Sequence, residues 1–333
     1  MRFLRRLFLL GILVAGCGAA WLWHFTWQPL IFTDTPHTFV LKPGSNIRTI
    51  SHQLVEESIL SEPWSFLIMA RLSSKASNIK AGNYQFTSGM TPYQIFQMMS
   101  DGDVSQAGIT FIEGWTFRQI REALNSSEGI EHISMELTDA QIMERIGASE
   151  SNPEGLFFPD TYYFVQGMSD IDILQRAYRT MQAKLQAAWD KKTQSLPYQS
   201  PYQALIMASI IEKETAKASE RPLVAKVFLN RLKIGMRLQT DPTVIYGLGQ
   251  KYEGNLHKVD LQNDTPYNTY TREGLPPTPI AMPGMASIEA ALNPATQSSA
   301  LYFVSKRDGS HAFSSSLEEH NRAVVRYQLE QHK

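Results

Sequence analysis

The chain has 333 residues, 43% of them hydrophobic, which is enough for two or three packed units. Its formal net charge of -1, with no long run of positive charge, argues against nucleic-acid binding. The single cysteine, Cys17, excludes an internal disulfide framework, and the eight histidines include no HExxH pair. We therefore expect no nucleic-acid partner, no metal and no cofactor.

The first predicted element is an apolar helix near the N-terminus. Three arginines within residues 1–6 precede an uncharged stretch from Leu7 to Trp27, close to the ~20 residues that cross a bilayer as a helix. Basic residues before such a span predict a cytoplasmic tail and an exported body. Residues 7–27 are thus predicted to be a transmembrane helix of a single-pass type II protein in the inner membrane.

Two alternatives for this segment stay open. It could be a cleaved signal peptide, or a lipoprotein signal in which Val14 to Cys17 forms the lipobox. The hydrophobic run continues for ten residues past Cys17, which a short signal core does not require. We favour the uncleaved anchor.

Residues 38–105 are predicted to form a small α+β module. A strand-like segment and an amphipathic helix are followed by a second helix, a second strand and a third helix that Thr91 and Pro92 open. The strand, helix, helix, strand order suits a two-layer unit. These elements are expected at residues 39–46, 46–58, 61–74, 81–87 and 91–102.

Residues 106–195 are predicted to be a second α+β segment with connecting helices, the last from Ile171 to about Lys192. Within it, Glu154 and Asp160 precede the aromatic residues Tyr162, Tyr163 and Phe164. Aromatic faces and acids together suit sugar binding, whereas core aromatics beside a Pro-Asp turn are the ordinary alternative. Both interpretations stay open.

Residues 196–333 are predicted to be predominantly helical, with proline-rich connections. Ser200 or Pro201 begins one helix, and Gly235 ends the next. We expect ordered loops at 241–249 and 267–284, a short helix at 287–294, a β-hairpin around Asp308-Gly309 and a final helix at 316–331.

Two acids, Glu212 and Glu214, stand at the end of an otherwise apolar helix. Burial would raise a carboxyl pKa toward neutrality and suit a general acid, although both acids could instead face water. Residues two apart on a helix project about 200° from each other. The two therefore cannot flank one bond; either one acts alone or a distant acid such as Asp241 joins it.

Several motifs in this order resemble the YceG-like endolytic murein transglycosylases, bacterial envelope enzymes that cut peptidoglycan glycan strands. The resemblance runs from about Thr38 to the C-terminus. The matching motifs are KAGNYQF (80–86), FIEGW (111–115), EGLFFPDTYYF (154–164), ASIIEKETA (208–216), VFLNRL (227–232), MRLQTDPTVIYG (236–247), YNTY (267–270), GLPPTPIAMPG (274–284) and HAFSSSLEEHN (311–321).

The resemblance implies a fold and a set of site residues. The fold class is α+β: an N-terminal membrane helix, a LysM-like glycan-binding module and a predominantly helical, lysozyme-like catalytic domain with a small β-hairpin. Glu214 is assigned as the catalytic acid because Thr215 follows it, which is similar to the Glu-Ser or Glu-Thr pair of lysozyme-like transglycosylases. Glu212→Gln is then expected to fold equally well. The substrate-binding residues implied are Gln239, Thr240, Asp241, Tyr246, Asn268, Tyr270, Glu154 and Asp160.

The implied activity is cleavage of the β-1,4 bond between MurNAc and GlcNAc with formation of 1,6-anhydro-MurNAc ends. The implied partners are peptidoglycan glycan strands and the inner membrane, with peptidoglycan synthases as candidates and the catalytic domain in the periplasm. Two other functions remain open: a non-catalytic membrane-tethered glycan-binding scaffold, and a muramidase-type hydrolase.

Overall fold

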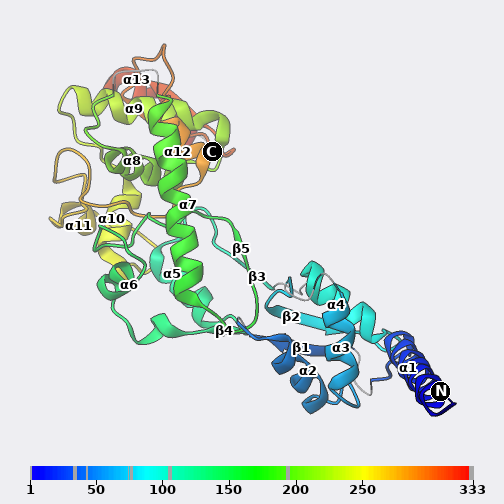
Figure 1. The fold of residues 1–333 in the computed structure, drawn as a ribbon. Coiled ribbons are helices and arrows are strands. Elements are labelled where there is room, and N and C mark those ends of the chain that lie inside the picture. The colour runs from blue at the N-terminus through cyan, green and yellow to red at the C-terminus, as the bar shows by residue number, and fades with distance from the viewer. Residues whose placement is uncertain are drawn as a thin grey trace. The chain divides into compact units, whose positions relative to one another are not determined.

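The structure is a computed structural model that describes residues 2–32, 36–42, 44–73, 75, 78–103, 107–192 and 196–329. It is a mixed α/β structure with mostly helical content, as predicted (Figure 1). The predicted boundaries at residues 105 and 195 lie outside the described residues. Residue contacts divide the chain into unit 1, made of Met1–Gly108 and Tyr163–Met168, and unit 2, made of Ile109–Tyr162 and Ser169–Lys333.

Unit 1 combines an apolar N-terminal helix with a two-stranded antiparallel sheet and three further helices. Phe39 of the first strand lies opposite Tyr84 of the second. The predicted strand, helix, helix, strand order is therefore confirmed, whereas its likeness to a LysM module stays a prediction. The elements are α1 (Arg2–Trp27), β1 (His37–Leu41), α2 (Ile47–Glu56), α3 (Trp64–Leu72), β2 (Gly82–Phe86) and α4 (Pro92–Asp101).

Local sequence signals explain where these helices begin. The Asn46 side chain accepts a hydrogen bond from the backbone N–H of Thr49, which caps α2. Thr91 forms a capping box with Gln94, and Pro92 occupies the first turn of α4. The core of unit 1 is aromatic, with fully buried Phe39, Phe66, Tyr84, Phe86 and Phe96.

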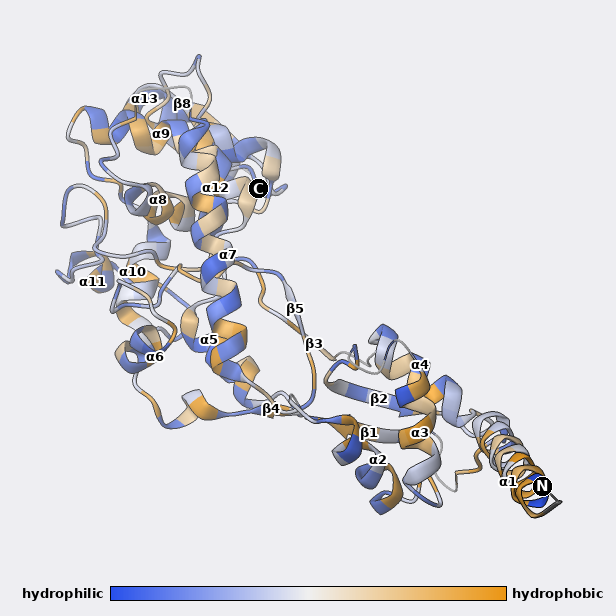
Figure 2. Ribbon diagram, in the orientation of Figure 1, coloured by the Kyte–Doolittle hydropathy of each residue, from blue (hydrophilic) through white to orange (hydrophobic). Residues whose placement is uncertain are grey.

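Helix α1 is the apolar helix that the sequence predicts. Residues Phe3–Trp27 have the length and hydropathy of a membrane-spanning helix or a signal sequence. Most of its side chains are exposed, and Figure 2 shows hydrophobic colours along most of its length. Such an apolar surface is costly in water, so a non-aqueous environment for α1 is consistent with the structure.

The remaining elements are mostly helices joined by irregular connections. They are β3 (Ala107–Thr110), α5 (Phe117–Asn125), β4 (Ile130–Glu131), α6 (Asp139–Arg145), β5 (Thr161–Phe164), β6 (Met168–Ser169), α7 (Asp170–Asp190), α8 (Pro201–Glu214), α9 (Arg221–Lys233), α10 (Asp241–Leu248), α11 (Lys258–Gln262), α12 (Met285–Leu292), β7 (Tyr302–Ser305), β8 (His311–Ser314) and α13 (Leu317–Val324). Strand β3 pairs with β5, β4 with β6, and β7 with β8.

Helix α8 lies at the centre of unit 2 and packs against α7, α9 and α12. Every residue from 204 to 211 is buried, so the apolar run is a core helix. Ser200 caps it by accepting a hydrogen bond from the N–H of Gln203, as predicted. Buried Ser209 accepts a hydrogen bond from the N–H of Ile280 at 3.0 Å, which fixes the proline-rich loop against the helix.

Two other expectations for this unit have opposite outcomes. The hairpin around Asp308-Gly309 is confirmed, since β7 and β8 pair antiparallel on either side of it. The expectation of an ordered loop at 241–249 is wrong, because residues Asp241–Leu248 form helix α10. Pro242 occupies its first turn, where a missing N–H breaks no helical hydrogen bond, and Asp241 complements the helix dipole.

Candidate active site

Glu214 is the last residue of α8, where the buried helix reaches a cavity. Its carboxylate accepts a hydrogen bond from the hydroxyl of Thr240. Burial raises the pKa of Glu214 from 4.5 to about 7; the Thr240 hydrogen bond opposes that shift, and the negative charge of Asp241 adds to it. At neutral pH this carboxyl can therefore both hold and release a proton.

The cavity at Glu214 has a volume of about 380 Å³. Four of the predicted site residues line it together with Glu214; they come from the start of α10, the two residues before it and the turn after α11. Aromatic and aliphatic side chains complete the wall, and Arg231 contributes a buried cation. The lining residues are Glu214, Phe228, Arg231, Leu238, Gln239, Thr240, Asp241, Tyr270, Tyr302, Phe303, Leu317 and His320.

The segment that holds Thr240 against Glu214 is fixed by backbone hydrogen bonds. Gln239 donates its N–H to the carbonyl of Thr269 at 3.1 Å, and Thr240 donates its N–H to the Thr269 hydroxyl at 3.1 Å. Gln239 has a φ of 49°, in the left-handed region that a residue with a side chain seldom adopts. Such strain at a cavity wall is typical of functional sites.

Asp241 and Tyr270 form a second polar pair in the same cavity. The Tyr270 hydroxyl donates to the Asp241 carboxylate at 2.5 Å. Asp241 is exposed and is the first residue of α10, whereas Glu214 is partly buried at the end of α8. The cavity thus holds two carboxyl groups in different environments.

Arg231, in α9, is a site residue that the sequence analysis did not single out. It is buried, and it donates to the backbone carbonyls of Leu301 at 2.6 Å and Leu238 at 2.7 Å. Its guanidinium lies 5.2 Å from the centre of the Tyr302 ring. The positive charge opposes the rise in the pKa of Glu214 and stabilises the carboxylate that remains after proton donation. The sequence signal that could have identified Arg231 was its position in the VFLNRL motif.

Glu212 lies on another side of α8 and makes structural contacts. It forms an ion pair with Arg221 at 2.9 Å, and the two side chains are only 5% and 8% exposed. It also accepts a hydrogen bond from the backbone N–H of Gly284 at 2.9 Å. The neighbouring Lys213 donates to the carbonyl of Gly114 at 3.2 Å. The end of α8 is thereby tied to α9 and to two irregular segments far away in the sequence.

Glu154 and Tyr246 meet in a second cavity of about 730 Å³ in unit 2. The Glu154 carboxylate accepts a hydrogen bond from the N–H of Phe117 at the start of α5, and it is hydrogen-bonded to Tyr246. Burial raises the pKa of Glu154 to about 7. Tyr246 also contacts the Tyr267 ring edge to face. The sequence analysis named both residues but did not place them together.

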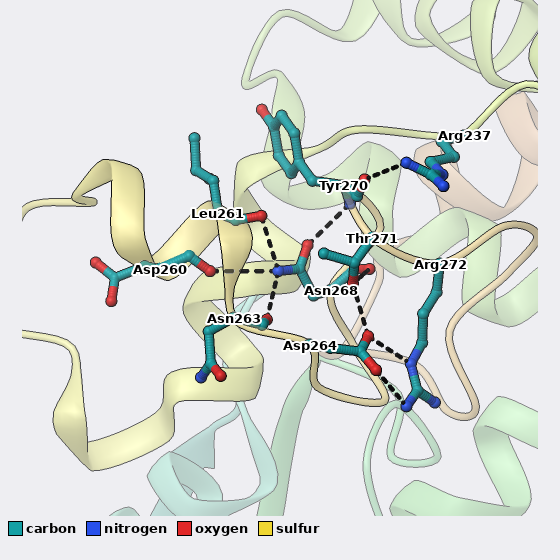
Figure 3. A network of polar contacts seen from close by, with 9 residues as sticks. All are labelled: Arg237, Asp260, Leu261, Asn263, Asp264, Asn268, Tyr270, Thr271 and Arg272. Atoms are coloured by element: carbon teal, nitrogen blue, oxygen red, sulfur yellow. Dashed lines mark hydrogen bonds and ion pairs between the residues drawn. The ribbon is translucent and has the colours of Figure 1, made fainter.

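Asn268 is buried and lies outside the linings of both cavities. Figure 3 shows the network of polar contacts around it. Its side-chain amide donates to the carbonyls of Asp260, Leu261 and Asn263, and its oxygen accepts the N–H of Tyr270. With its donors and acceptor engaged in this way, Asn268 shapes the turn that presents Tyr270 to the cavity.

Asp160 is also outside both cavity linings. It is exposed and caps its own turn by accepting the N–H of Thr161 at 2.8 Å. In the described part of the chain, no group of three or more His, Cys, Asp or Glu side chains is arranged to hold a metal ion.

Comparisons with known proteins agree on one family. The model of the YceG-like family matches residues 39–326. A Bacillus subtilis protein named endolytic murein transglycosylase is 33% identical over 302 residues, which cover 85% of this chain and 82% of that protein. A Streptococcus pneumoniae protein of the same name is 27% identical over 87% of this chain, and the match spans 58% of its length. The crystal structure of a YceG-like protein from Listeria monocytogenes aligns with a TM-score of 0.54 and 31% identity, covering 86% of this chain and 98% of that one.

Proposed function

This chain belongs to the YceG-like family, and on that premise we propose that it is a membrane-anchored endolytic lytic transglycosylase of peptidoglycan. The proposed reaction cleaves the β-1,4 bond from MurNAc to GlcNAc and leaves a 1,6-anhydro-MurNAc end. The observation that carries the proposal is the partly buried Glu214, whose carboxyl pKa is raised by desolvation to about 7 at the wall of a cavity. A carboxyl group with a pKa near neutrality can donate a proton in one step and accept a proton in the next, as a combined general acid and base must.

In the first step, protonated Glu214 donates its proton to the oxygen of the scissile glycosidic bond. The bond from muramic C1 to that oxygen breaks, and positive charge develops at C1 as an oxocarbenium-like state. Asp241 supplies negative charge on the same cavity wall, where it would stabilise this state electrostatically. Thr240 holds the Glu214 carboxyl in position throughout.

In the second step, the Glu214 carboxylate takes the proton from the C6 hydroxyl of the same muramic sugar. The C6 oxygen attacks C1 and closes the 1,6-anhydro ring, which returns Glu214 to its protonated form. Because the sugar supplies its own nucleophile, no water enters the product and one acid is sufficient. This role fits a cavity in which one carboxyl group, that of Glu214, is partly buried and desolvated and the other, that of Asp241, is exposed.

Product analysis tests this assignment against the two alternatives. Purified full-length protein is incubated with glycan strands in heavy-oxygen water, and the products are examined by mass spectrometry. We expect ends lighter than reducing ends by one water molecule, without heavy oxygen. Reducing ends that carry heavy oxygen would identify a muramidase-type hydrolase, and intact strands a non-catalytic scaffold.

The hydrolase alternative depends on Asp241, because an acid-pair enzyme needs a second carboxylate. In the proposed mechanism Asp241→Asn retains part of the activity and changes its pH dependence. Asp241 raises the pKa of Glu214, so its neutralisation lowers that pKa. Activity requires protonated Glu214 and falls as pH rises through its pKa, near 7 in the unmodified protein. The decline should therefore begin at lower pH in Asp241→Asn.

The measurement is the pH profile of kcat/KM for both proteins. Asn at position 241 still accepts the Tyr270 hydrogen bond, so the cavity wall is preserved. A shift to higher pH would contradict the electrostatic role of Asp241. A loss of activity as large as that of Glu214→Gln would instead favour the acid-pair hydrolase.

We also propose that the LysM-like module of unit 1 contributes glycan binding more than chemistry. It has a separate hydrophobic core that is rich in aromatic residues. Deletion of residues 38–102 is expected to weaken association with purified sacculi while some turnover of short glycans remains. A co-sedimentation assay checks this; equally tight binding by the shortened chain would refute it.

We place the protein in the inner membrane, with α1 as a single-pass type II anchor and unit 2 in the periplasm. The support is the apolar length of α1 and the basic residues that precede its hydrophobic part. Protease added to spheroplasts should then digest the body of the protein. Processing at Cys17, or a mature chain that lacks α1, would overturn the anchor. Peptidoglycan synthases remain candidate partners because they act on the same strands.

A further inference from the structure

Helix α3 of unit 1 carries a stripe of large apolar side chains that no described residue covers. Trp64, Ile68 and Leu72 are 61%, 49% and 75% exposed and follow each other at intervals of four residues. This spacing places them on one face of the helix. Between them, Phe66 and Ala70 are completely buried in the core of the unit.

Helix α3 is therefore hydrophobic on both faces. A helix that lies on a water-exposed protein surface normally pairs one apolar face with a polar one. A helix that is apolar all round has both faces covered, by protein or by lipid. In the described part of the chain, the Phe66 face is covered by the core of unit 1, but the stripe of Trp64, Ile68 and Leu72 has no cover.

The helix that packs against α3 is α1, the proposed membrane anchor, and this contact indicates that lipid covers the stripe. Helix α1 packs directly against α3 and α4 within unit 1. Trp21 of α1 donates its indole N–H to the hydroxyl of Ser65 at 3.2 Å, and Ser65 follows Trp64 in α3. Phe25 of α1 is buried against the same core. The apolar helix and α3 are thus joined at the level of Trp21.

The level of this contact can be compared with the depth of a membrane interface. Trp21 lies six residues before Trp27, the end of α1, which corresponds to ~9 Å along a helix. Interfacial helices bury their apolar faces about 5–10 Å into the boundary between headgroups and acyl chains. If α1 spans the bilayer, α3 is therefore brought to the depth of an interfacial helix.

We propose that the stripe of Trp64, Ile68 and Leu72 is a membrane-binding surface, which inserts α3 into the outer interfacial layer of the bilayer that α1 crosses. The charged groups of α3 are compatible with this placement. Arg71 is exposed in the last turn, where a long basic side chain can reach lipid phosphates. The Glu62 carboxylate accepts hydrogen bonds from the N–H groups of Trp64 and Ser65, so it caps the helix.

This inference rests on the proposed anchor and deepens it. A module that contacts the bilayer through both α1 and α3 has its orientation relative to the membrane fixed. The glycan binding proposed for this module would then take place close to the bilayer. The enzyme would engage glycan strands next to the membrane in preference to strands in outer layers of the wall.

The native Cys17 allows the two attachments to be tested separately. It is the single cysteine of the chain and is exposed on α1, so an environment-sensitive fluorophore on it reports insertion of the anchor. A Cys17→Ala chain with Ile68→Cys reports on α3. The matched control, Cys17→Ala with His52→Cys, places the fluorophore at an exposed position of α2. Each full-length protein is placed, one copy per disc, in phospholipid nanodiscs with nitroxide-labelled lipids.

The expected result is a blue shift with quenching by deep nitroxides at position 17, a blue shift with quenching by shallow nitroxides at position 68, and neither at position 52. An inserted fluorophore at position 17 together with a water-exposed fluorophore at position 68 would contradict the proposed membrane-binding surface but not the proposed anchor. A blue shift at 68 without quenching would show that protein, not lipid, covers the stripe. A water-exposed fluorophore at 17 would overturn both the anchor and the surface.

Discussion

Glu214→Gln is expected to abolish nearly all glycan cleavage. Glutamine keeps the shape of the side chain and can still accept the Thr240 hydrogen bond, but it has no proton to donate. General acid–base assistance contributes roughly 10²–10⁴-fold. Because the same group acts in both proposed steps, the loss should lie at or beyond the upper end of this range. Turnover of glycan strands by the purified variant measures it, and an active variant would contradict the assignment of Glu214.

The pH dependence of the free energy of unfolding shows whether Glu214→Gln loses its activity through missing chemistry or through unfolding. The folded pKa of Glu214, about 7, is above its ordinary value of 4.5, so the folded state binds the proton more tightly. Stability should therefore fall as pH rises from about 4.5 through 7, by up to about 3 kcal/mol. Glu214→Gln lacks this penalty and should be more stable than the unmodified protein at pH values above 7. Denaturation curves at acidic and alkaline pH check the sign.

Glu212→Gln is expected to unfold much more easily while retaining its activity when folded. The sequence analysis expected this variant to fold equally well, whereas the contacts of Glu212 in the structure favour the opposite prediction. Glu212 is the carboxylate partner of a buried Arg221, whose Nε has no hydrogen-bond partner among the described residues. Removing one charge of such a pair leaves the other buried without compensation, which costs about 3–5 kcal/mol.

Chemical denaturation of Glu212→Gln and of the unmodified protein measures this loss of stability. Glu318→Gln is the matched control. Glu318 also pairs with an arginine, Arg322 at 2.8 Å, but the two side chains are 82% and 66% exposed. Exposed pairs of this kind contribute about 0.2–1 kcal/mol. A Glu212→Gln protein no less stable than Glu318→Gln would contradict a structural role for Glu212. A stable but inactive Glu212→Gln protein beside an active Glu214→Gln protein would reverse the catalytic assignment.

The starts of several helices were predictable because capping is a local interaction. Asn46, Thr91 and Ser200 each bond to a backbone N–H three residues ahead, so the sequence alone contains the signal. Helix α10 was missed for a related reason. Pro242 was interpreted as part of a loop, although a proline in the first turn is compatible with a helix.

The sequence by itself determined that Glu212 and Glu214 point in different directions, because the helical repeat fixes the angle between them. It could not determine which of them faces a cavity. The tertiary structure decided this through partners remote in the chain: Gly284 lies 72 residues from Glu212, and Thr240 lies 26 residues from Glu214. Likewise, only folding separated Tyr246 and Glu154 from the cavity at Glu214 and brought Arg231 into it. The physical reason is that a pattern along a helix depends on neighbouring residues, whereas the desolvation and charge that raise the pKa of Glu214 come from segments that meet only in the folded core.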